Sequence, residues 1–250
     1  MSSPSDSDGG DRPAPDLRPS DLRAPDLRAP DQRAPDPAAA ALLAGDPLEV
    51  APRLLGSLLH GRGVTVRLSE VEAYRGADDP GSHAFRGETP RTRPMFLGAG
   101  HVYAYFTYGM HTCVNLVAGE PGVASGLLIR AGEVVEGAEL ALARRSADRQ
   151  GRAIPHRDLA RGPARLARAL GVVLADSGSP LLPLDRPDLD GLRLEPRPAL
   201  PVERIASGPR VGVAGPGGDA AAHPWRFWIA DDATVSLYRP AVARRRRPPE

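Results

Sequence analysis

Apolar and polar residues alternate over residues 64–74, a pattern that predicts a β-strand. On strict alternation, one face of this strand carries Val64, Val66, Leu68, Glu70, Glu72 and Tyr74. That face begins apolar and ends with two carboxylates and a tyrosine. We therefore expect a core strand that runs into a pocket.

A helix is predicted just before this strand. Asp46 is a good N-cap residue, and Pro47 suits the first helical position. Folding is therefore expected to begin near Asp46. The apolar positions that follow at helical spacing are Leu48, Ala51, Leu55, Leu58 and Leu59.

The rest of the chain mixes strands and helices without a repeated strand–helix–strand rhythm. Strands are expected over 101–108, 113–117 and 126–131, helices over 133–145 and 162–170, and a closing hairpin of 225–229 with 234–238. In the second strand, Tyr103 and Tyr105 would share one face. This order favours an α+β fold over a doubly wound sheet.

Both ends of the chain differ from its centre. Residues 1–37 repeat Asp-Leu-Arg with a period of five and carry eight prolines, so we expect a disordered tail, with a linear binding motif as the alternative. Residues 38–243 would form the folded domain, and residues 244–250 an arginine-rich tail. The formal net charge is only +1, so nucleic-acid binding would need a local arginine patch.

Composition narrows the compartment and the chemistry. No apolar run approaches the length of a membrane span, the N-terminus does not resemble a signal peptide, and one cysteine cannot form an internal disulfide. We therefore expect a cytoplasmic protein. All 32 basic residues are arginine, so no lysine side chain can form a Schiff base, and sugar chemistry would use water or the terminal amine.

The segment from Glu72 to Asn115 concentrates the groups suited to binding a planar ligand. It holds seven of the eleven aromatic residues, the only cysteine and the only asparagine. Aromatic rings stack on flat groups such as nucleobases. Glu72 beside them could serve as a base or acid, or could be a strand-end carboxylate paired with an arginine. Glu70 is an equal candidate on spacing alone.

No metal site or other cofactor is expected. His83, His101 and His111 follow one another at intervals that match no compact ligand pattern. No glycine-rich phosphate loop opens a helix, and no serine occupies a nucleophile-elbow pattern.

An ordered set of motifs resembles the alkyladenine (3-methyladenine, or N-methylpurine) DNA glycosylase family of the mammalian type. The resemblance covers roughly residues 46–240. The motifs lie at 70–74, His83, 89–93, 95–96, 103–110, Asn115, 127–131, 162–163, 210–213 and 224–227. The implied fold is a compact domain around a curved antiparallel β-sheet with flanking helices and without a helix-hairpin-helix.

The resemblance assigns roles to the polar residues. Glu72 matches the general base that activates water for attack on the sugar C1′. Arg130 matches the arginine that helps to hold that water and the carboxylate, and the backbone carbonyl of Val211 would complete the water site. Asn115 matches the residue that crowds the exocyclic amine of guanine and so disfavours normal purines.

The resemblance also assigns the aromatic residues. Tyr74, His83 and Tyr105 match the walls that enclose the extruded base. Tyr108 matches the side chain that inserts into the duplex. Tyr103 is interpreted as a packing residue on its strand.

Together these assignments imply a monofunctional base-excision-repair enzyme. It would flip alkylated purines out of double-stranded DNA, chiefly 3-methyladenine and 7-methylguanine, with ethenoadenine and hypoxanthine as further candidates. Hydrolysis of the N-glycosidic bond would leave an abasic site. Arg91 and Arg93 would contact phosphates, or would simply decorate a loop. We expect a monomer that acts on the nucleoid. The alternatives are a non-catalytic module that binds damaged DNA or nucleobases, and a hydrolase of free nucleosides or sugars.

Overall fold

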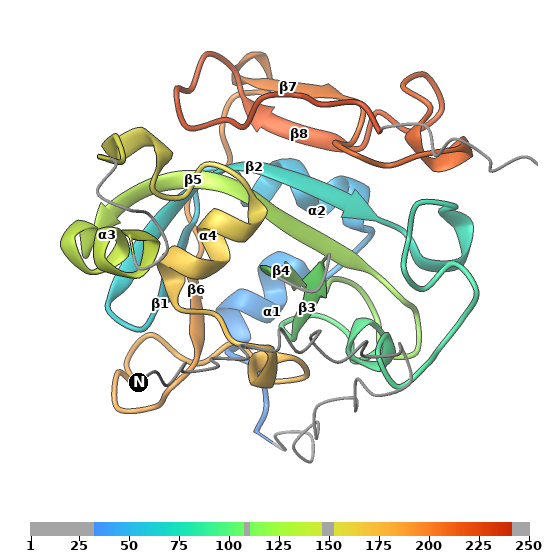
Figure 1. Cartoon of the computed structure of the whole chain (residues 1–250). Coiled ribbons are helices and arrows are strands. Elements are labelled where there is room, and N and C mark those ends of the chain that lie inside the picture. The colour runs from blue at the N-terminus through green and yellow to red at the C-terminus, as the bar shows by residue number, and fades with distance from the viewer. Residues whose placement is uncertain (1–32, 108–110, 147–152, 242–250) are drawn as a thin grey trace, which may run out of the picture.

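The computed structural model describes residues 33–107, 111–146 and 153–241. Within these ranges the chain forms an α+β domain (Figure 1). The helices are α1 (Pro37–Leu43), α2 (Pro47–Leu54), α3 (Ala138–Ser146) and α4 (Pro163–Leu170). The strands are β1 (Leu58–Gly61), β2 (Val64–Tyr74), β3 (Val102–Thr107), β4 (His111–Leu116), β5 (Gly126–Glu136), β6 (Leu192–Glu195), β7 (Ile205–Gly208) and β8 (Arg226–Ile229). The α+β prediction is confirmed.

Strand β2 is the centre of the sheet. The described strands form one antiparallel sheet in the order β3-β4-β5-β2-β1-β6, and β8 pairs with both β2 and β7. β2 pairs with β5 along its length, with β1 near its start, and with β8 over residues 70–72. The C-terminal part of β2 therefore lies between β5 and β8, with the β7–β8 pair above the rest of the sheet in Figure 1.

An irregularity in the middle of β2 decides which face carries the carboxylates. The pairing with β5 shifts register on both sides of Glu70. The β2 residues in the hydrophobic core are Val64, Val66, Leu68, Val71 and Ala73. Beyond the irregularity the core face thus continues through the odd positions. The expectation that Glu70, Glu72 and Tyr74 share the face of the first three apolar residues is wrong, because a β-bulge changes the alternation.

Folding begins earlier than Asp46. Helix α1 starts at Pro37, and its N-cap Asp36 accepts a hydrogen bond of 2.9 Å from the backbone N–H of Ala39. Asp46 caps α2 as predicted, accepting from Leu48 N–H at 2.9 Å. Of the disordered tail predicted over residues 1–37, residues 1–32 lie outside the described residues and Pro37 belongs to α1. The tail predicted over 244–250 also lies outside the described residues.

The predicted helix that starts at Pro47 is too long. α2 ends at Leu54, and Leu58 and Leu59 belong to strand β1. The chain turns at Gly56, which adopts a φ of +87° that a residue with a side chain would rarely take. The leucine spacing alone did not reveal this turn.

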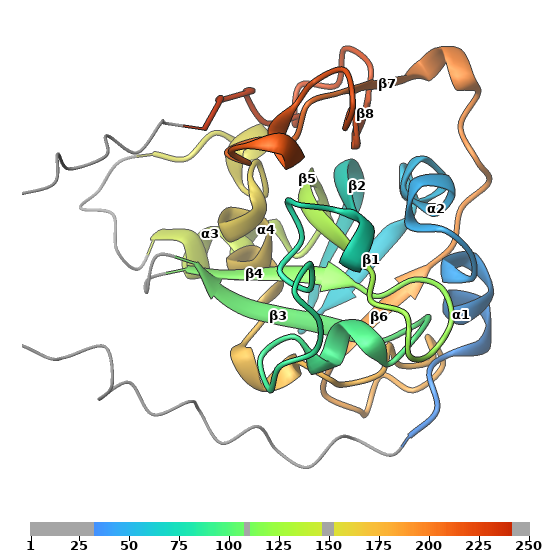
Figure 2. The same ribbon diagram turned by 90° about the vertical axis from the view of Figure 1, so that its right-hand side faces the viewer.

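The helix predicted over 133–145 also begins later. Residues 133–136 continue β5, and α3 starts at Ala138 after Gly137. A side chain at Gly137 would meet the backbone carbonyl of Gly63, so the chain requires glycine where β5 ends. The helix predicted over 162–170 is confirmed as α4, and Figure 2 shows α4 and α2 on opposite sides of the β2–β5 pair.

The predicted closing hairpin is wrong. β8 pairs with β7, which the sequence pattern did not reveal, and residues 234–238 form no strand. These residues instead bond to the bulge of β2 through polar groups. Thr234 Oγ1 donates to Ser69 Oγ at 2.7 Å, and the Ser236 N–H donates to Glu70 at 2.7 Å.

Two expectations concern features at the level of the whole fold. None of the helices in the described ranges combines the length and the apolar character needed to cross a membrane. The expected lack of a helix-hairpin-helix stays a prediction.

Candidate active site

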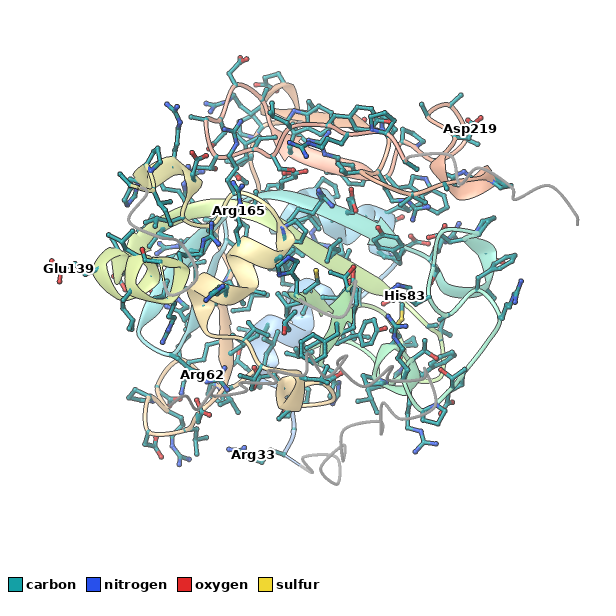
Figure 3. The ribbon with its side chains drawn as sticks, in the orientation of Figure 1. Arg33, Arg62, His83, Glu139, Arg165 and Asp219 are labelled. Carbon is teal, nitrogen blue, oxygen red and sulfur yellow. The ribbon has the colours of Figure 1, made fainter. Side chains whose placement is uncertain are left out.

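A cavity of about 510 Å³ opens at the C-terminal end of β2. Its wall combines residues from β2 to β5, the start of α4 and two loops. The lining residues are Tyr74, Pro80, Gly81, His83, Met95, Tyr103, Tyr105, Thr107, Cys113, Asn115, Leu128, Arg130, Pro163, Val211, Gly212, Val213 and Ala214. The predicted wall residues Tyr74, His83 and Tyr105 are all among them. Figure 3 labels His83 on the loop that follows β2.

Three rings form an ordered cluster on one wall of this cavity. Tyr103 and Tyr105 stack with 5.4 Å between ring centroids, and His83 meets Tyr105 edge-on at 4.7 Å. His83 Nδ1 lies 3.0 Å from the Tyr103 hydroxyl, which fixes the imidazole orientation. The loss of solvent around the ring, and then the charge of Arg91, lower the pKa of His83. The imidazole is therefore neutral at pH 7.

Glu72 is completely buried directly behind the cavity wall. Its Oε1 accepts a hydrogen bond of 2.7 Å from the backbone N–H of Val211. Its Oε2 accepts from the Tyr74 hydroxyl at 2.8 Å and lies 3.3 Å from Arg130 Nη1. All three partners line the cavity, so Glu72 contacts the residues that a bound ligand would touch.

Glu70 differs from Glu72 in the number and the location of its hydrogen-bond partners. Its carboxylate receives Arg130 Nε at 2.9 Å, Arg226 Nε at 2.7 Å, and the Ser236 N–H and hydroxyl at 2.7 and 3.0 Å. Three of these donors reach Oε1 of Glu70 and one reaches Oε2, and of the residues that supply them only Arg130 lines the cavity. Among the described residues, Oε1 of Glu72 accepts only from Val211, which leaves an acceptor position on that oxygen. The geometry therefore separates two residues that spacing alone could not.

Charge neutralisation explains how the two carboxylates tolerate burial. Burial raises the pKa of Glu70, but Arg130, Arg226 and the Ser236 hydrogen bonds outweigh it and leave the pKa below its usual value. Burial lowers the pKa of Arg130, while Glu72 and then Glu70 raise it further than burial lowers it. Arg130 is thus a permanent cation shared between both carboxylates.

Two lining residues on β4, Asn115 and Cys113, differ in polarity. Asn115 is buried, and its Nδ2 donates to the Tyr103 carbonyl at 3.1 Å. Cys113 pairs with Tyr105 in the sheet register, and burial raises the pKa of its thiol to about 11. The thiol therefore stays protonated, as expected for a small buried residue.

The remaining predicted contacts lie outside this wall or outside the described residues. Arg91 is exposed beside the cavity, with its guanidinium carbon 5.8 Å from the Tyr105 ring centroid. Arg93 is exposed and pairs with Glu88 at 3.0 Å. Tyr108 lies outside the described residues. The phosphate contacts and the insertion of Tyr108 stay predictions.

Sequence reasoning missed several contributors. Tyr103 was interpreted as packing, but it both packs and lines the cavity, and its alternation with Tyr105 was the available signal. Met95 and Leu128 complete the apolar part of the wall. Both lie in motifs that carry the family resemblance, at 95–96 and 127–131, but no role was assigned to them. Over the ranges that the structure describes, no three His, Cys, Asp or Glu side chains converge to hold a metal ion.

Comparison with known proteins shows the family of this chain. A family model described as methylpurine-DNA glycosylase matches residues 41–233. The chain belongs to that family. The resemblance seen in the sequence is therefore confirmed at the family level, and with it a DNA repair hydrolase of the glycosylase class.

Two close relatives of this chain come from bacteria. A protein of Streptomyces avermitilis is 48% identical over 215 residues, which span 84% of this chain and 96% of the relative. A protein of Leifsonia xyli is 51% identical over 208 residues, spanning 81% and 92%. Both carry the name "Putative 3-methyladenine DNA glycosylase". A specifically mammalian type stays a prediction.

Proposed function

We propose that the protein excises alkylated purines, such as 3-methyladenine and 7-methylguanine, from double-stranded DNA by hydrolysis of the N-glycosidic bond. Glu72 activates the water. The product is an abasic site, and the absence of lysine side chains fits a monofunctional enzyme without a lyase step. Action as a monomer on the nucleoid is part of this proposal.

The single observation that carries the proposal is the environment of Glu72. A buried carboxylate held by two hydrogen bonds and one ion pair, with an acceptor position left on Oε1, can take a proton from a water in the cavity. Its partners Tyr74, Arg130 and Val211 fix the carboxylate in one orientation. Preorganised groups of this kind cost no rearrangement when the reaction occurs.

The aromatic wall supports recognition of a flipped base. A base inside a duplex is out of reach, and extruding it costs about a few kcal/mol. Stacking of an electron-poor cationic purine on a tyrosine face recovers on the order of 0.5–2 kcal/mol per ring. Tyr74, Tyr105 and neutral His83 supply such surfaces at the cavity. Tyr108 is proposed to fill the gap left in the duplex.

The proposed step is balanced without a cofactor. The water oxygen bonds to C1′ while the C1′–N bond breaks, and the water proton passes to the open site of Glu72. The bonding electrons leave with the alkylated purine, which is already cationic and departs neutral. Arg130 stabilises the carboxylate, and the Val211 carbonyl is proposed as a second contact to the water.

The proposed discrimination rests on Asn115. Its amide is held in place by the Tyr103 carbonyl at the floor of the cavity. A normal guanine would bring its exocyclic amine against this fixed group. 7-Methylguanine carries the same amine, and it is proposed as a substrate because its cationic ring is a better leaving group. Ethenoadenine and hypoxanthine remain candidate substrates, and Arg91 and Arg93 are proposed phosphate contacts.

The test is excision from a defined duplex. The protein is incubated with duplexes that carry one 7-methylguanine or one ethenoadenine, and abasic sites are measured by strand cleavage in alkali. We expect abasic product from the wild type and none from Glu72→Gln. Lesion binding without any abasic product would instead establish the non-catalytic module.

A further inference from the structure

We propose that Arg210, paired with Asp79, is a positioning residue that sets both the general base and one wall of the base pocket. The inference rests on the proposed function and deepens it. Arg210 lines no part of the cavity and its role is not to touch substrate. Its place is directly behind the residues that do.

Arg210 connects three segments at one point. It is buried, with 1% of its surface exposed. Its Nη1 and Nη2 donate to Asp79 Oδ2 and Oδ1 at 2.5 and 2.6 Å. The same nitrogens donate to the Ala73 carbonyl at 2.9 Å and the Gly217 carbonyl at 2.8 Å. One guanidinium thus holds together the end of β2, the loop after it, and the segment after β7.

The first consequence concerns the general base. Ala73 lies between Glu72 and Tyr74 on β2, and Arg210 immediately precedes Val211. Val211 is the residue whose N–H bonds to Glu72 Oε1. Fixing Arg210 on the Ala73 carbonyl therefore fixes the distance between Val211 and Glu72.

The second consequence concerns the pocket walls. The Arg210 guanidinium carbon lies 4.5 Å from the Tyr74 ring centroid, so the cation supports the ring from behind. Asp79 also accepts from the backbone N–H of Gly81 at 2.8 Å and of Arg75 at 3.2 Å. It thereby shapes the loop that leads to His83.

Gly81 lies in close contact with the Arg210 guanidinium. A Cβ built on Gly81 would lie 2.5 Å from Arg210 Nη2. Gly81 itself lines the cavity, so Arg210 is separated from the pocket there by a single backbone layer. Any displacement of Arg210 must move that wall.

The buried Arg210–Asp79 pair is explained better by the fixed geometry that it imposes than by a gain in stability. Burying two charges is expensive, and well-packed apolar replacements of such pairs are often as stable or more stable. A guanidinium offers planar donors in fixed directions, which lysine cannot reproduce. The arrangement uses those directions on Asp79, Ala73 and Gly217.

The chain offers a matched control in Arg62 and Asp176. Arg62 Nη1 and Nη2 donate to the two Asp176 carboxylate oxygens at 3.0 and 2.7 Å, and Nη1 also donates to the Gly171 carbonyl at 2.9 Å. This pair shares the forked geometry but lines no part of the cavity. Figure 3 shows Arg62 well separated from His83.

The experiment compares Arg210→Lys with Arg62→Lys in the full chain. Single-turnover excision of 7-methylguanine is measured with enzyme in excess, alongside thermal melting and affinity for an undamaged duplex. We expect Arg210→Lys to slow excision by about 10–100-fold, the scale for a misplaced catalytic group, with duplex affinity unchanged. Arg62→Lys should melt earlier and excise at the wild-type rate at temperatures where it is folded.

The outcomes separate the two proposals. A folded Arg210→Lys variant that excises as fast as an active wild type would overturn the positioning role alone. A wild type that forms no abasic sites would overturn the proposed function instead. If Arg210→Lys does not melt cooperatively, Asp79→Asn replaces it, since the amide oxygen can still accept from Gly81. That variant should also lose excision rate, and an unchanged rate would overturn the role.

Discussion

The backbone N–H of Val211 donates a 2.7 Å hydrogen bond to Oε1 of Glu72, across 139 residues of sequence. The Glu72 carboxylate therefore has all three of its partners only when the segment after β7 packs against the end of β2. Its own strand supplies only the Tyr74 hydroxyl, so the orientation of Glu72 is fixed by the folded domain and not by β2 alone. This dependence makes the two neighbouring glutamates experimentally separable.

Glu72→Gln should abolish excision while sparing the fold. The amide cannot accept the water proton, but its oxygen can still accept from Val211. Loss of a general base costs on the order of 10²–10⁴-fold in rate. Single-turnover excision on a lesion duplex measures the effect, and thermal melting serves as the control. Excision at the wild-type rate would remove Glu72 from the mechanism.

Glu70→Gln should mainly lower stability. The change leaves Arg130 and Arg226, both buried, without their shared carboxylate. Removing one partner of a buried ion pair costs about 3–5 kcal/mol of unfolding free energy. Urea denaturation at pH 7 measures it. Glu133→Gln is the matched control, because its partner Arg67 is partly exposed and such pairs contribute about 0–1 kcal/mol. Equal losses in the two variants would contradict the prediction.

The contribution of Glu70 should depend on pH in a defined direction. Its pKa in the folded protein lies below the ordinary value of 4.5. An unfolded chain therefore binds this proton first as pH falls. The stabilisation is fully present above about pH 4.5 and is lost as pH falls through the lower folded pKa. Urea denaturation of wild type and Glu70→Gln between pH 7 and 3 should show their difference shrinking only below 4.5. If the difference in unfolding free energy between the two proteins stays constant from pH 7 to 3, the lowered pKa of Glu70 is refuted.

The core pattern of β2 was readable from the sequence, but its effect on the site was not. Alternation predicted the strand and its first three core residues, Val64, Val66 and Leu68. At the bulge, Ser69 and Glu70 bond to Thr234 and Ser236, which lie far along the chain. Period-two patterning contains no record of such long-range bonds. It therefore placed the carboxylates on the wrong face.

The choice between Glu70 and Glu72 illustrates the same limit. Glu70 and Glu72 lie on the same predicted strand and, on strict alternation, on the same face of it. They differ in their partners, since Arg226 and Ser236 meet Glu70 whereas Val211 meets Glu72. Those partners lie more than one hundred residues away, so only the fold could separate the two. The family resemblance supplied Glu72 in advance of that geometry.

The charge state of His83 should affect the affinity for a cationic lesion. Its pKa lies below the usual 6.5 because of the loss of solvent around the ring and the charge of Arg91. A neutral imidazole suits a cationic base, and protonation would place two positive charges together. Affinity for a 7-methylguanine duplex, measured with Glu72→Gln to prevent excision, should fall as pH drops below 6.5 through the His83 pKa.

A second variant isolates the imidazole in this measurement. His83→Gln, made in the Glu72→Gln protein, can still hydrogen-bond the Tyr103 hydroxyl but cannot gain a charge. Its affinity should therefore lack the part of the pH dependence that His83 causes. Fluorescence anisotropy between pH 8 and 5 compares the two proteins. If both lose affinity in parallel, the dependence comes from the DNA or from another group, and His83 does not act as a neutral wall.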